Sequence, residues 1–593
     1  MLDLVRLLRV PSVDVDAGYD ISPDGTKIAF SWNLTGQWEV YEVSLAPAAT
    51  PIRLTYSPGG KFAPCYSPDG TRLAYMVDLD GGENYHLCLY TFTTHTHRDL
   101  TPEIAHALQP SFDWSPDGRQ IAILSNRTGC FSTFILEVDS GEERLVLENG
   151  CPAMEVRWSP AGDWLAVRAE TDGQDYGIFL VPLQGGSSVQ LSDGGAPLNS
   201  HDPCWSPDGM SLAFCSDLAG NYNIGIYSLA ARKIAWLSGT AGDRTHPDWS
   251  PDGQRLAAVV SQGADTWLSL IDAQGQSTSP RVGHGLHRLP RFIPDGQGLV
   301  CIFDNPCQPP DFWLLSLSDG AAHQLTHSLP DDLLPGQFVM PEEIRYPGKD
   351  GVEVPALLYR PPGMSTPAPA VVNIHGGPNW EYKYAWFPLM THLASHGWVV
   401  LAPNYRGSTG YGRDWQLANR FDIGGVDTRD VAAGAEYLIR QGLADPGRIA
   451  ITGRSHGGYL TMTCLTQFPE LWAGGSAVVP FLNWFTAHEN SRSDLQHWDI
   501  ENMGRPEENH DLWQERSPFF FLDKVCSPVQ LICGAHDPRC PASESEAARD
   551  RLLSLGKTVD FHLYPDEGHI LLNVENLIDA EQRRVDFLAR LLE

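Results

Sequence analysis

A four-residue turn sequence recurs through the first half of the chain and restricts the fold more than any other feature. Its seven copies begin 45, 48, 44, 47, 44 and 43 residues apart, at Ser22, Ser67, Ser115, Ser159, Ser206, Ser250 and Ile293. Most copies read Ser-Pro-Asp-Gly, the fourth reads Ser-Pro-Ala-Gly and the last reads Ile-Pro-Asp-Gly. Proline second and glycine fourth are typical of a type I turn. Such regular spacing predicts a repeat protein.

Each repeat holds four short β-rich runs around its turn. An aromatic run precedes the turn, as in Pro203–Trp205, and runs such as Leu212–Phe214 and Ile224–Tyr227 follow it. Four strands in about 45 residues are typical of a propeller blade, so we predict a seven-bladed β-propeller over residues 15–328. Every blade is complete within its own repeat, which predicts a ring that no exchanged strand closes. A β-solenoid or irregular β domain is the alternative.

The pattern changes near residue 335. A polar, proline-bearing stretch at 329–340 is suited to a linker. Beyond it, apolar strands such as 398–401, 448–451 and 529–532 alternate with helical segments such as 427–441 and 543–555. Buried strands alternating with helices predict a parallel sheet covered on both faces, here an α/β-hydrolase domain over 341–593. A chain of 593 residues is too long for one core, in agreement with two domains. Residues 1–14 carry a short amphipathic helix at 2–9.

The segment Gly453–Gly457 matches G-x-S-x-G, with Ser455 at its centre. It follows a predicted strand and precedes a predicted helix at about 458–467, the context of a nucleophile elbow. The two glycines leave room for the sharp turn that exposes the serine hydroxyl. A glycine-rich turn without a catalytic role is the alternative.

The partners of a nucleophilic serine follow in the order Asp, His, each after a later strand. Asp537 and His569 stand in these places. His569 would take the serine proton, and Asp537 would hold the imidazole in the required tautomer. His536 is on the wrong side of this order and His562 lies within a strand. Asp566 and Glu567 precede His569 in the same turn, which disfavours them as the triad acid.

An acyl-transfer site also needs donors for the tetrahedral oxyanion. His375–Pro378 follows the strand 370–374, where an oxyanion loop belongs. The expected donors are the backbone N–H groups of Gly377 and of His456, the residue after the nucleophile.

Composition excludes several other classes of function. The formal net charge of −32 disfavours nucleic acid and anionic membrane surfaces as partners. No stretch approaches the roughly 20 apolar residues that span a bilayer, and the N-terminus lacks a signal peptide's apolar core. Twelve cysteines without a CxxC motif or paired metal spacing predict free thiols, with no metal site and no cofactor. These features predict a cytoplasmic protein.

The combined motifs resemble those of the prolyl oligopeptidase family, and most of all its acylaminoacyl-peptidase branch. They are His375–Pro378, Asn404–Gly412, Gly453–Tyr459, the D-x-R-x-P segment at Asp537 and Asp566–His569, placed after a seven-bladed propeller. The resemblance covers nearly the whole chain. It implies that Arg539 binds a substrate carbonyl or carboxylate, and that Phe481 and Trp484 line an apolar S1 pocket. It also implies that the propeller admits only short peptides, that the N-terminal helix docks on the hydrolase domain, and that the chain forms a homo-oligomer.

The dipeptidyl peptidases of this family hold a free amine with two adjacent glutamates on a propeller insertion. The even repeat spacing leaves little room for such an insertion, and neither Glu142-Glu143 nor Glu507-Glu508 matches its position. The sequence thus predicts a serine peptidase of acylaminoacyl-peptidase or oligopeptidase type that acts on short peptides. An esterase or small-amide hydrolase on the same scaffold is the first alternative. A propeller interaction module with an inactive hydrolase domain is the second.

Overall fold

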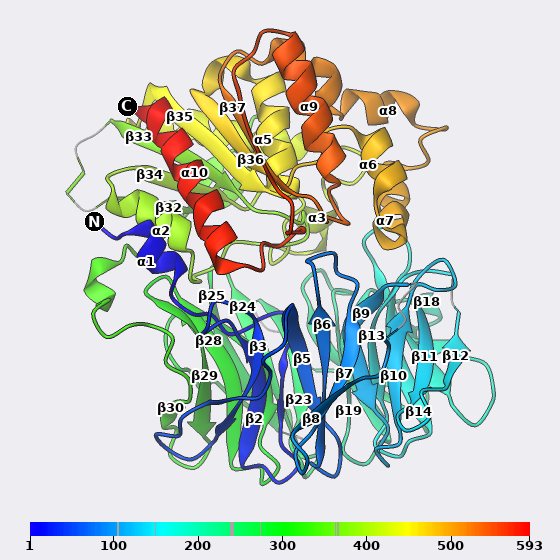
Figure 1. The fold of residues 1–593 in the computed structure, drawn as a ribbon. Coiled ribbons are helices and arrows are strands. Elements are labelled where there is room, and N and C mark those ends of the chain that lie inside the picture. Colours follow the sequence, from blue (N-terminus) through cyan, green and yellow to red (C-terminus); the bar gives the residue numbers. More distant parts are fainter. Residues whose placement is uncertain (103–105, 149, 238–241, 273, 362, 365–366) are drawn as a thin grey trace.

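The computed structural model describes residues 1–593 except 103–105, 149, 238–241, 273, 362 and 365–366. It has two parts, a ring of β-sheets and an α/β domain seated on one end of that ring (Figure 1). Among the described residues, no helix is both long enough and apolar enough to cross a membrane.

The ring contains seven four-stranded antiparallel sheets within the described ranges, one for each turn repeat. Blade 1 holds β1 (Tyr19–Ile21), β2 (Lys27–Trp32), β3 (Glu39–Ser44) and β4 (Ile52–Arg53). Blade 2 holds β5 (Gly60–Tyr66), β6 (Arg72–Asp78), β7 (His86–Thr91) and β8 (Thr96–Asp99). Blade 3 holds β9 (Leu108–Trp114), β10 (Gln120–Ser125), β11 (Ser132–Glu137) and β12 (Glu143–Leu147). Blade 4 holds β13 (Ala153–Trp158), β14 (Trp164–Glu170), β15 (Tyr176–Pro182) and β16 (Val189–Gln190).

A small hairpin, β17 (Ser192–Asp193) and β18 (Ala196–Pro197), precedes the fifth blade. Blade 5 holds β19 (Ser200–Trp205), β20 (Ser211–Ser216), β21 (Asn223–Ser228) and β22 (Lys233–Trp236). Blade 6 holds β23 (Asp243–Trp249), β24 (Arg255–Gln262), β25 (Asp265–Asp272) and β26 (Ser277–Thr278). Blade 7 holds β27 (Leu286–Phe292), β28 (Gly298–Asn305), β29 (Gln308–Ser316) and β30 (Ala322–Gln324). Each sheet contains four consecutive strands, so the predicted ring without an exchanged strand is confirmed.

Side chains on the innermost strands join one blade to the next. In three blades, the aspartate that precedes the turn repeat accepts a hydrogen bond from a backbone N–H of the following blade. These pairs are Asp20 with Tyr66 (2.8 Å), Asp113 with Trp158 (2.7 Å) and Asp248 with Phe292 (2.7 Å). At the junction of blades 7 and 1, Arg291 Nη1 lies 3.2 Å from Asp20 Oδ1. Polar contacts therefore bridge the junction that lacks an exchanged strand.

The α/β domain is built on one eight-stranded sheet. Its strands are β31 (Glu342–Pro347), β32 (Glu353–Tyr359), β33 (Ala368–Ile374), β34 (Val399–Pro403), β35 (Ala444–Arg454), β36 (Gly474–Val478), β37 (Val529–Gly534) and β38 (Val559–Tyr564). The strand order is β31-β32-β34-β33-β35-β36-β37-β38. In this order, the six strands from β34 to β38 are parallel to their neighbours, as predicted. At the other edge, β31 pairs antiparallel with β32, and β32 pairs antiparallel with β34. A short turn can connect β31 and β32 because they are antiparallel.

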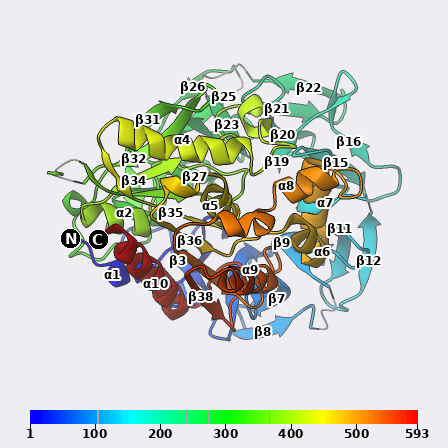
Figure 2. The same ribbon diagram turned by 90° about the horizontal axis from the view of Figure 1, so that it is seen from above.

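Helices cover both faces of this sheet. They are α2 (Pro388–Ser395), α3 (Arg413–Leu417), α4 (Val426–Arg440), α5 (His456–Gln467), α6 (Trp484–Asn490), α7 (Ser493–Met503), α8 (His510–Glu515), α9 (Ala542–Ser554) and α10 (Val574–Leu592), with 3-10 turns at Pro335–Gln337, Pro469–Leu471 and Pro518–Lys524. Val372 faces the core that contains α4, α5 and α9, while its neighbour Val371 faces α2 and α10. Seen from above, α4 and α10 lie on opposite sides of the sheet (Figure 2).

The N-terminal helix α1 (Leu4–Leu8) packs on the α/β domain beside α2 and α10 (Figure 1). Asp3 caps it, because its carboxylate accepts a hydrogen bond from the Arg6 N–H at 2.8 Å. Leu4 joins the apolar cluster of α2 and α10. This short segment thus ties the start of the chain to its last helix.

Candidate active site

Ser455 occupies a sharp turn between β35 and α5. Its backbone has a φ of 58° and a ψ of −123°, a conformation that non-glycine residues seldom adopt. A Cβ built on Gly453 would lie 2.4 Å from the Gly457 carbonyl oxygen, and one built on Gly457 would lie 2.3 Å from the Ile374 carbonyl oxygen. Both glycines are therefore required sterically. Helix α5 begins at His456, earlier than the predicted 458, because the elbow passes directly into the helix.

The three predicted triad side chains meet above the ends of parallel strands. Asp537 follows β37 and His569 follows β38. His569 Nε2 lies 3.0 Å from Ser455 Oγ, and His569 Nδ1 lies 2.7 Å from Asp537 Oδ2. The Asp537 carboxylate also accepts backbone N–H bonds from Arg539 and Cys540, both at 2.8 Å. With Asp537 fixed in this way, His569 can accept the serine proton.

The competing titratable groups lie elsewhere. His536 directs Nδ1 to the backbone carbonyl of Asp80, at 3.0 Å, in the propeller. His562 pairs with Asp579 at 3.6 Å. Asp566 accepts a bond from Asn576, and the buried Glu567 accepts backbone N–H bonds from Leu572 and Asn573. These contacts give Glu567 a structural role in the loop that carries His569.

The predicted oxyanion donors come from two adjoining segments. The first intrahelical hydrogen bond of α5 runs from the Tyr459 N–H to the Ser455 carbonyl, which leaves the His456 N–H at the open end of the helix. On the other side, a Cβ built on Gly376 would lie 3.3 Å from Ser455 Cβ, so the loop carrying Gly377 passes close to the nucleophile. Gly377 adopts a φ of 120°, which favours glycine.

Hydrogen bonds at His375 hold this loop. The Tyr405 hydroxyl donates to the His375 carbonyl at 2.9 Å, and His375 Nε2 lies 2.9 Å from Ser408 Oγ. Burial lowers the pKa of His375 to about 3, so the ring stays neutral. A neutral ring with these hydrogen bonds holds the loop in position.

A propeller loop that sequence reasoning missed closes over the predicted triad. Residues 79–85, between β6 and β7, place Gly81 against Gly568, where a Cβ built on Gly568 would lie 1.8 Å from the Gly81 carbonyl oxygen. Glu83 lies 2.7 Å from Arg539 and 3.2 Å from Arg492. The signal for this loop was its Gly81-Gly82 pair, but only docking of the domains shows what it contacts.

Arg539 therefore reaches the propeller. Glu83, whose side chain is 6% exposed, binds its Nε, yet the Arg539 side chain stays 43% exposed. Arg492 also forms a two-bond pair with Asp494. The two guanidinium groups together offset the charge of Glu83.

The two predicted pocket aromatics differ in their surroundings. Phe481 stacks on Tyr459 with ring centroids 4.4 Å apart, and it is partly exposed. Trp484 is 2% exposed and donates its indole N–H to the Tyr459 hydroxyl at 3.2 Å. Buried Glu544 accepts the backbone N–H bonds of Leu482 and Asn483, which fixes the segment. Phe481 can face a substrate, while Trp484 supports it from the core.

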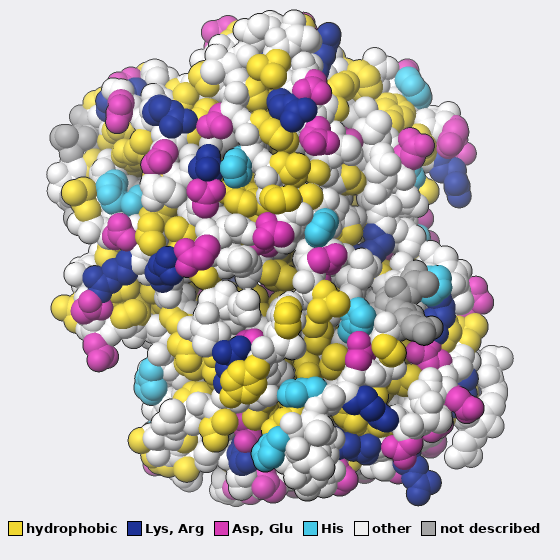
Figure 3. All heavy atoms as spheres, in the orientation of Figure 1, with side chains coloured by type: hydrophobic (Ala, Val, Ile, Leu, Met, Phe, Trp, Pro, Cys, Tyr) yellow, Lys and Arg dark blue, Asp and Glu magenta, His cyan; other side chains and the backbone are white. Residues whose placement is uncertain are grey.

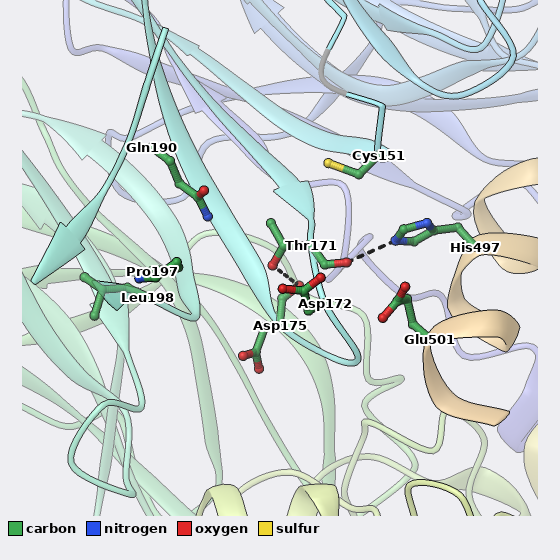
Figure 4. Close-up of a pocket in the computed structure, with 9 residues that line it drawn as sticks. All are labelled: Cys151, Thr171, Asp172, Asp175, Gln190, Pro197, Leu198, His497 and Glu501. Atoms are coloured by element: carbon green, nitrogen blue, oxygen red, sulfur yellow. Dashed lines mark hydrogen bonds between the residues drawn. The ribbon is translucent and has the colours of Figure 1, made fainter. Parts of the chain in front are cut away.

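A hollow lies at the seam between blade 4 and α7, and none of the predicted triad residues lines it. Figure 4 shows Thr171, Asp172 and Asp175 on the propeller side, facing His497 and Glu501 on α7. The cavity measures about 360 Å³. Two of its acids are partnered, because Asp175 binds Arg413 and Glu501 accepts the Gly173 N–H. Elsewhere on the surface, acidic and basic side chains are interspersed on the face that Figure 3 draws.

Comparison with known proteins shows that the chain is similar to several peptidases. Residues 385–593 match the prolyl oligopeptidase family, and residues 20–221 and 83–280 match the TolB beta propeller domain. The chain is 27% identical to an uncharacterized peptidase, YuxL, of Bacillus subtilis, over 86% of this chain and 94% of the relative. It is 29% identical to the human acylamino-acid-releasing enzyme, over 77% of this chain and 68% of that enzyme.

A solved structure shares the whole fold. A puromycin-hydrolyzing peptidase of Mycobacterium tuberculosis superposes with a TM-score of 0.87 at 19% identity, covering 100% of this chain and 96% of that chain. At this level of identity the likeness concerns the fold alone.

Proposed function

Residues 385–593 form a domain of the prolyl oligopeptidase family, and on that premise we propose that the chain is a serine peptidase that cleaves short peptides through an acyl-enzyme on Ser455. One observation carries the proposal: His569 joins Ser455 and Asp537 by hydrogen bonds of 3.0 and 2.7 Å beneath a propeller loop. The proposal requires no metal or organic cofactor for the reaction.

The proposed mechanism follows from these distances. Ser455 Oγ attacks the scissile carbonyl while His569 Nε2 takes its proton, and Asp537 stabilises the resulting imidazolium. The N–H groups of Gly377 and His456 would bind the oxyanion. His569 then protonates the departing amine, and water hydrolyses the ester on Ser455 by the reverse sequence of proton transfers.

The propeller supports a limit on substrate size. Gly81 contacts Gly568 beside His569, and Glu83 contacts Arg539, so the ring covers the site closely. A folded protein would have to displace these contacts before a loop of its chain reached Ser455. We therefore expect cleavage of short peptides and little cleavage of folded proteins.

The charges near the site support a blocked N-terminus on the substrate. Glu83 is the propeller acid beside Arg539, and both Arg539 and Arg492 offset its charge. A compensated carboxylate attracts a free ammonium group weakly, whereas an uncharged acylated terminus needs no counter-charge. Glu507-Glu508 is exposed, and Glu143 pairs with Arg127 on an outer strand. The name of the human relative, acylamino-acid-releasing enzyme, agrees with this reading.

The exposed part of Arg539 is suited to a substrate oxygen, because a guanidinium fork binds carbonyl and carboxylate groups well. We expect Arg539→Ala to lose cleavage of acyl-aminoacyl amides while retaining cleavage of p-nitrophenyl esters. Arg549→Ala, at an exposed pair in α9, is the matched control. Equal loss on amides and esters would contradict a substrate-binding role and favour the esterase alternative.

A substrate panel tests the proposal as a whole. Acetylated and free-amine aminoacyl p-nitroanilides, a blocked tetrapeptide and p-nitrophenyl esters would be compared on the wild type and on Ser455→Ala. The proposal predicts fastest turnover of acetylated substrates and an inactive variant. Turnover of esters alone would contradict it.

Three other expectations from the sequence stay predictions. They are the domain limits at 14, 328 and 340, the cytoplasmic location and the homo-oligomer.

A further inference from the structure

Cys540 brings a thiol to the predicted triad, and the proposed reaction has no use for it. Its side chain is 5% exposed. It stands three residues after Asp537, and its backbone N–H binds that carboxylate. The thiol thus lies beside the carboxylate and the imidazole of the predicted triad.

Three different metal-binding side chains converge here. The three residues are Asp537, Cys540 and His569, and all of them are buried. Each offers one ligand atom, and these three atoms lie within 4.8 Å of one another. Within the described ranges, this is the one group of three or more histidine, cysteine and acidic residues with such close ligand atoms. Sequence reasoning missed it because Cys540 and His569 come from different loops and form no local motif.

The mixed donor set fits one class of ion. Thiolate, imidazole and carboxylate together are typical ligands of Zn²⁺, whereas Mg²⁺ and Ca²⁺ prefer oxygen alone. Tetrahedral Zn²⁺ holds a thiolate sulfur and an imidazole nitrogen roughly 3.6 Å apart, so side-chain shifts of about 1 Å would close the site. Three protein ligands leave a fourth position for water.

We propose that Cys540, His569 and Asp537 form an inhibitory site for Zn²⁺. Binding converts the Cys540 thiol to a thiolate and releases its proton to solvent. The ion binds one ring nitrogen of His569. If it binds Nε2, the ring cannot accept the Ser455 proton. If it binds Nδ1, the hydrogen bond to Asp537 is lost. Bound Zn²⁺ therefore stops proton transfer, and a chelator restores it. The inhibition rests on the proposed triad, but the binding of the ion does not.

The pH dependence follows from the ligands. Protons compete with Zn²⁺ for the thiolate and the imidazole, so inhibition strengthens as pH rises and weakens as pH falls. A nonspecific loss of activity through aggregation would not be reversed by a chelator.

The test uses the full chain, stripped of metal with a chelator and titrated separately with Zn²⁺ and Cd²⁺. Activity on an acetylated aminoacyl p-nitroanilide reports inhibition, and the ultraviolet charge-transfer band of a cadmium–thiolate bond reports binding. We expect one ion per chain and reversible loss of activity. Cys540→Val should lose the band and need at least tenfold more Zn²⁺ for half-inhibition of its own activity. Cys540→Ser provides the same comparison should Cys540→Val fold poorly.

Two further variants separate this proposal from the proposed function. Cys526→Ser removes an exposed thiol and should leave both the band and the inhibition unchanged. Ser455→Ala lacks the proposed nucleophile but keeps all three ligands, so it should still show the band. A band of equal strength in Cys540→Val would overturn the site. A Cys540-dependent band without loss of activity would overturn the inhibition, whereas an inactive wild type that shows the band would count against the proposed peptidase alone.

Discussion

The propeller and the α/β domain reach their folds by opposite routes. In the propeller, one local arrangement recurs: the turn glycine donates its N–H to the carbonyl of the first turn residue, at 2.8 Å in blades 1 and 7 alike. In the α/β domain, Ser455, Asp537 and His569 each occur once and meet only after three separate strands have paired. The first region repeats one local signal in every blade, whereas each residue of the predicted triad occurs once.

This contrast extends to tolerance of change. In blade 4, Ala161 stands where most blades have aspartate, and the Ser159 hydroxyl donates to Asp163 instead, at 3.0 Å. In blade 7, Ile293 lacks the hydroxyl altogether, yet the turn still closes. We therefore expect the propeller to tolerate variation that the predicted site does not, and the following variants test this difference.

The largest effect is expected at Asp537. Asp537→Asn leaves the loop geometry but favours the wrong tautomer of His569, so kcat/KM on peptides should fall by about 10⁴-fold. Steady-state kinetics measure this, with thermal unfolding as the check on folding. Asp566→Asn is the matched control, since Asp566 contacts Asn576 and should keep wild-type activity. Similar losses in both variants would contradict the assignment.

The next effect lies where the two regions touch. In Gly568→Ala, the new methyl group would overlap the Gly81 carbonyl and displace the loop that carries His569. A misplacement of this kind should lower kcat/KM by about 10–100-fold. The control is Gly336→Ala, where an added Cβ meets nothing within 4 Å. Unchanged kinetics in Gly568→Ala would mean that the propeller loop does not position the site.

A smaller effect is expected at the junction of blades 7 and 1. Arg291→Leu leaves Asp20, already raised in pKa by burial, without its cation. Because the Arg291 side chain is 35% exposed, solvent reduces the cost, and the free energy of unfolding should fall by about 1–2 kcal/mol. Urea denaturation measures it. Arg119→Leu, at an exposed pair, should change stability by less than about 0.5 kcal/mol.

The smallest effect is expected in a single turn. Asp208→Ala removes bonds from the Ser206 hydroxyl (2.6 Å) and the Met210 N–H (2.9 Å), and should cost about 0.5–1 kcal/mol. Asp295→Ala in blade 7 removes only the Gln297 N–H bond and should cost less. Urea denaturation compares the two. If Asp295→Ala lowered the free energy of unfolding more than Asp208→Ala, the cost would not follow the number of turn hydrogen bonds removed, and the comparison of the blades would be contradicted.

The sequence predicted the parts that depend on local order. The repeat predicted every blade, because each turn is made by neighbouring residues. The elbow at Ser455 and the order of Asp537 and His569 also followed from position relative to strands. The antiparallel edge of β31 and β32 did not follow, because alternation of strands and helices describes only the later part of the sheet.

The contacts between the domains could not be predicted from the sequence. Glu83 meets Arg539, and Gly81 meets Gly568, across more than 450 residues of chain. No periodicity records such pairs, since they depend on how two finished surfaces dock. For the same reason, the sequence does not distinguish Cys540 from the other cysteines that it predicts to be free thiols.

Identification of the labelled residue tests the central claim most directly. The full chain would be treated with a fluorophosphonate probe, digested and analysed by mass spectrometry, beside Ser455→Ala and Asp537→Asn. The proposed triad predicts one adduct, on Ser455, which is absent from Ser455→Ala and forms much more slowly in Asp537→Asn. An adduct on another serine, or equal labelling of Ser455→Ala, would contradict the triad.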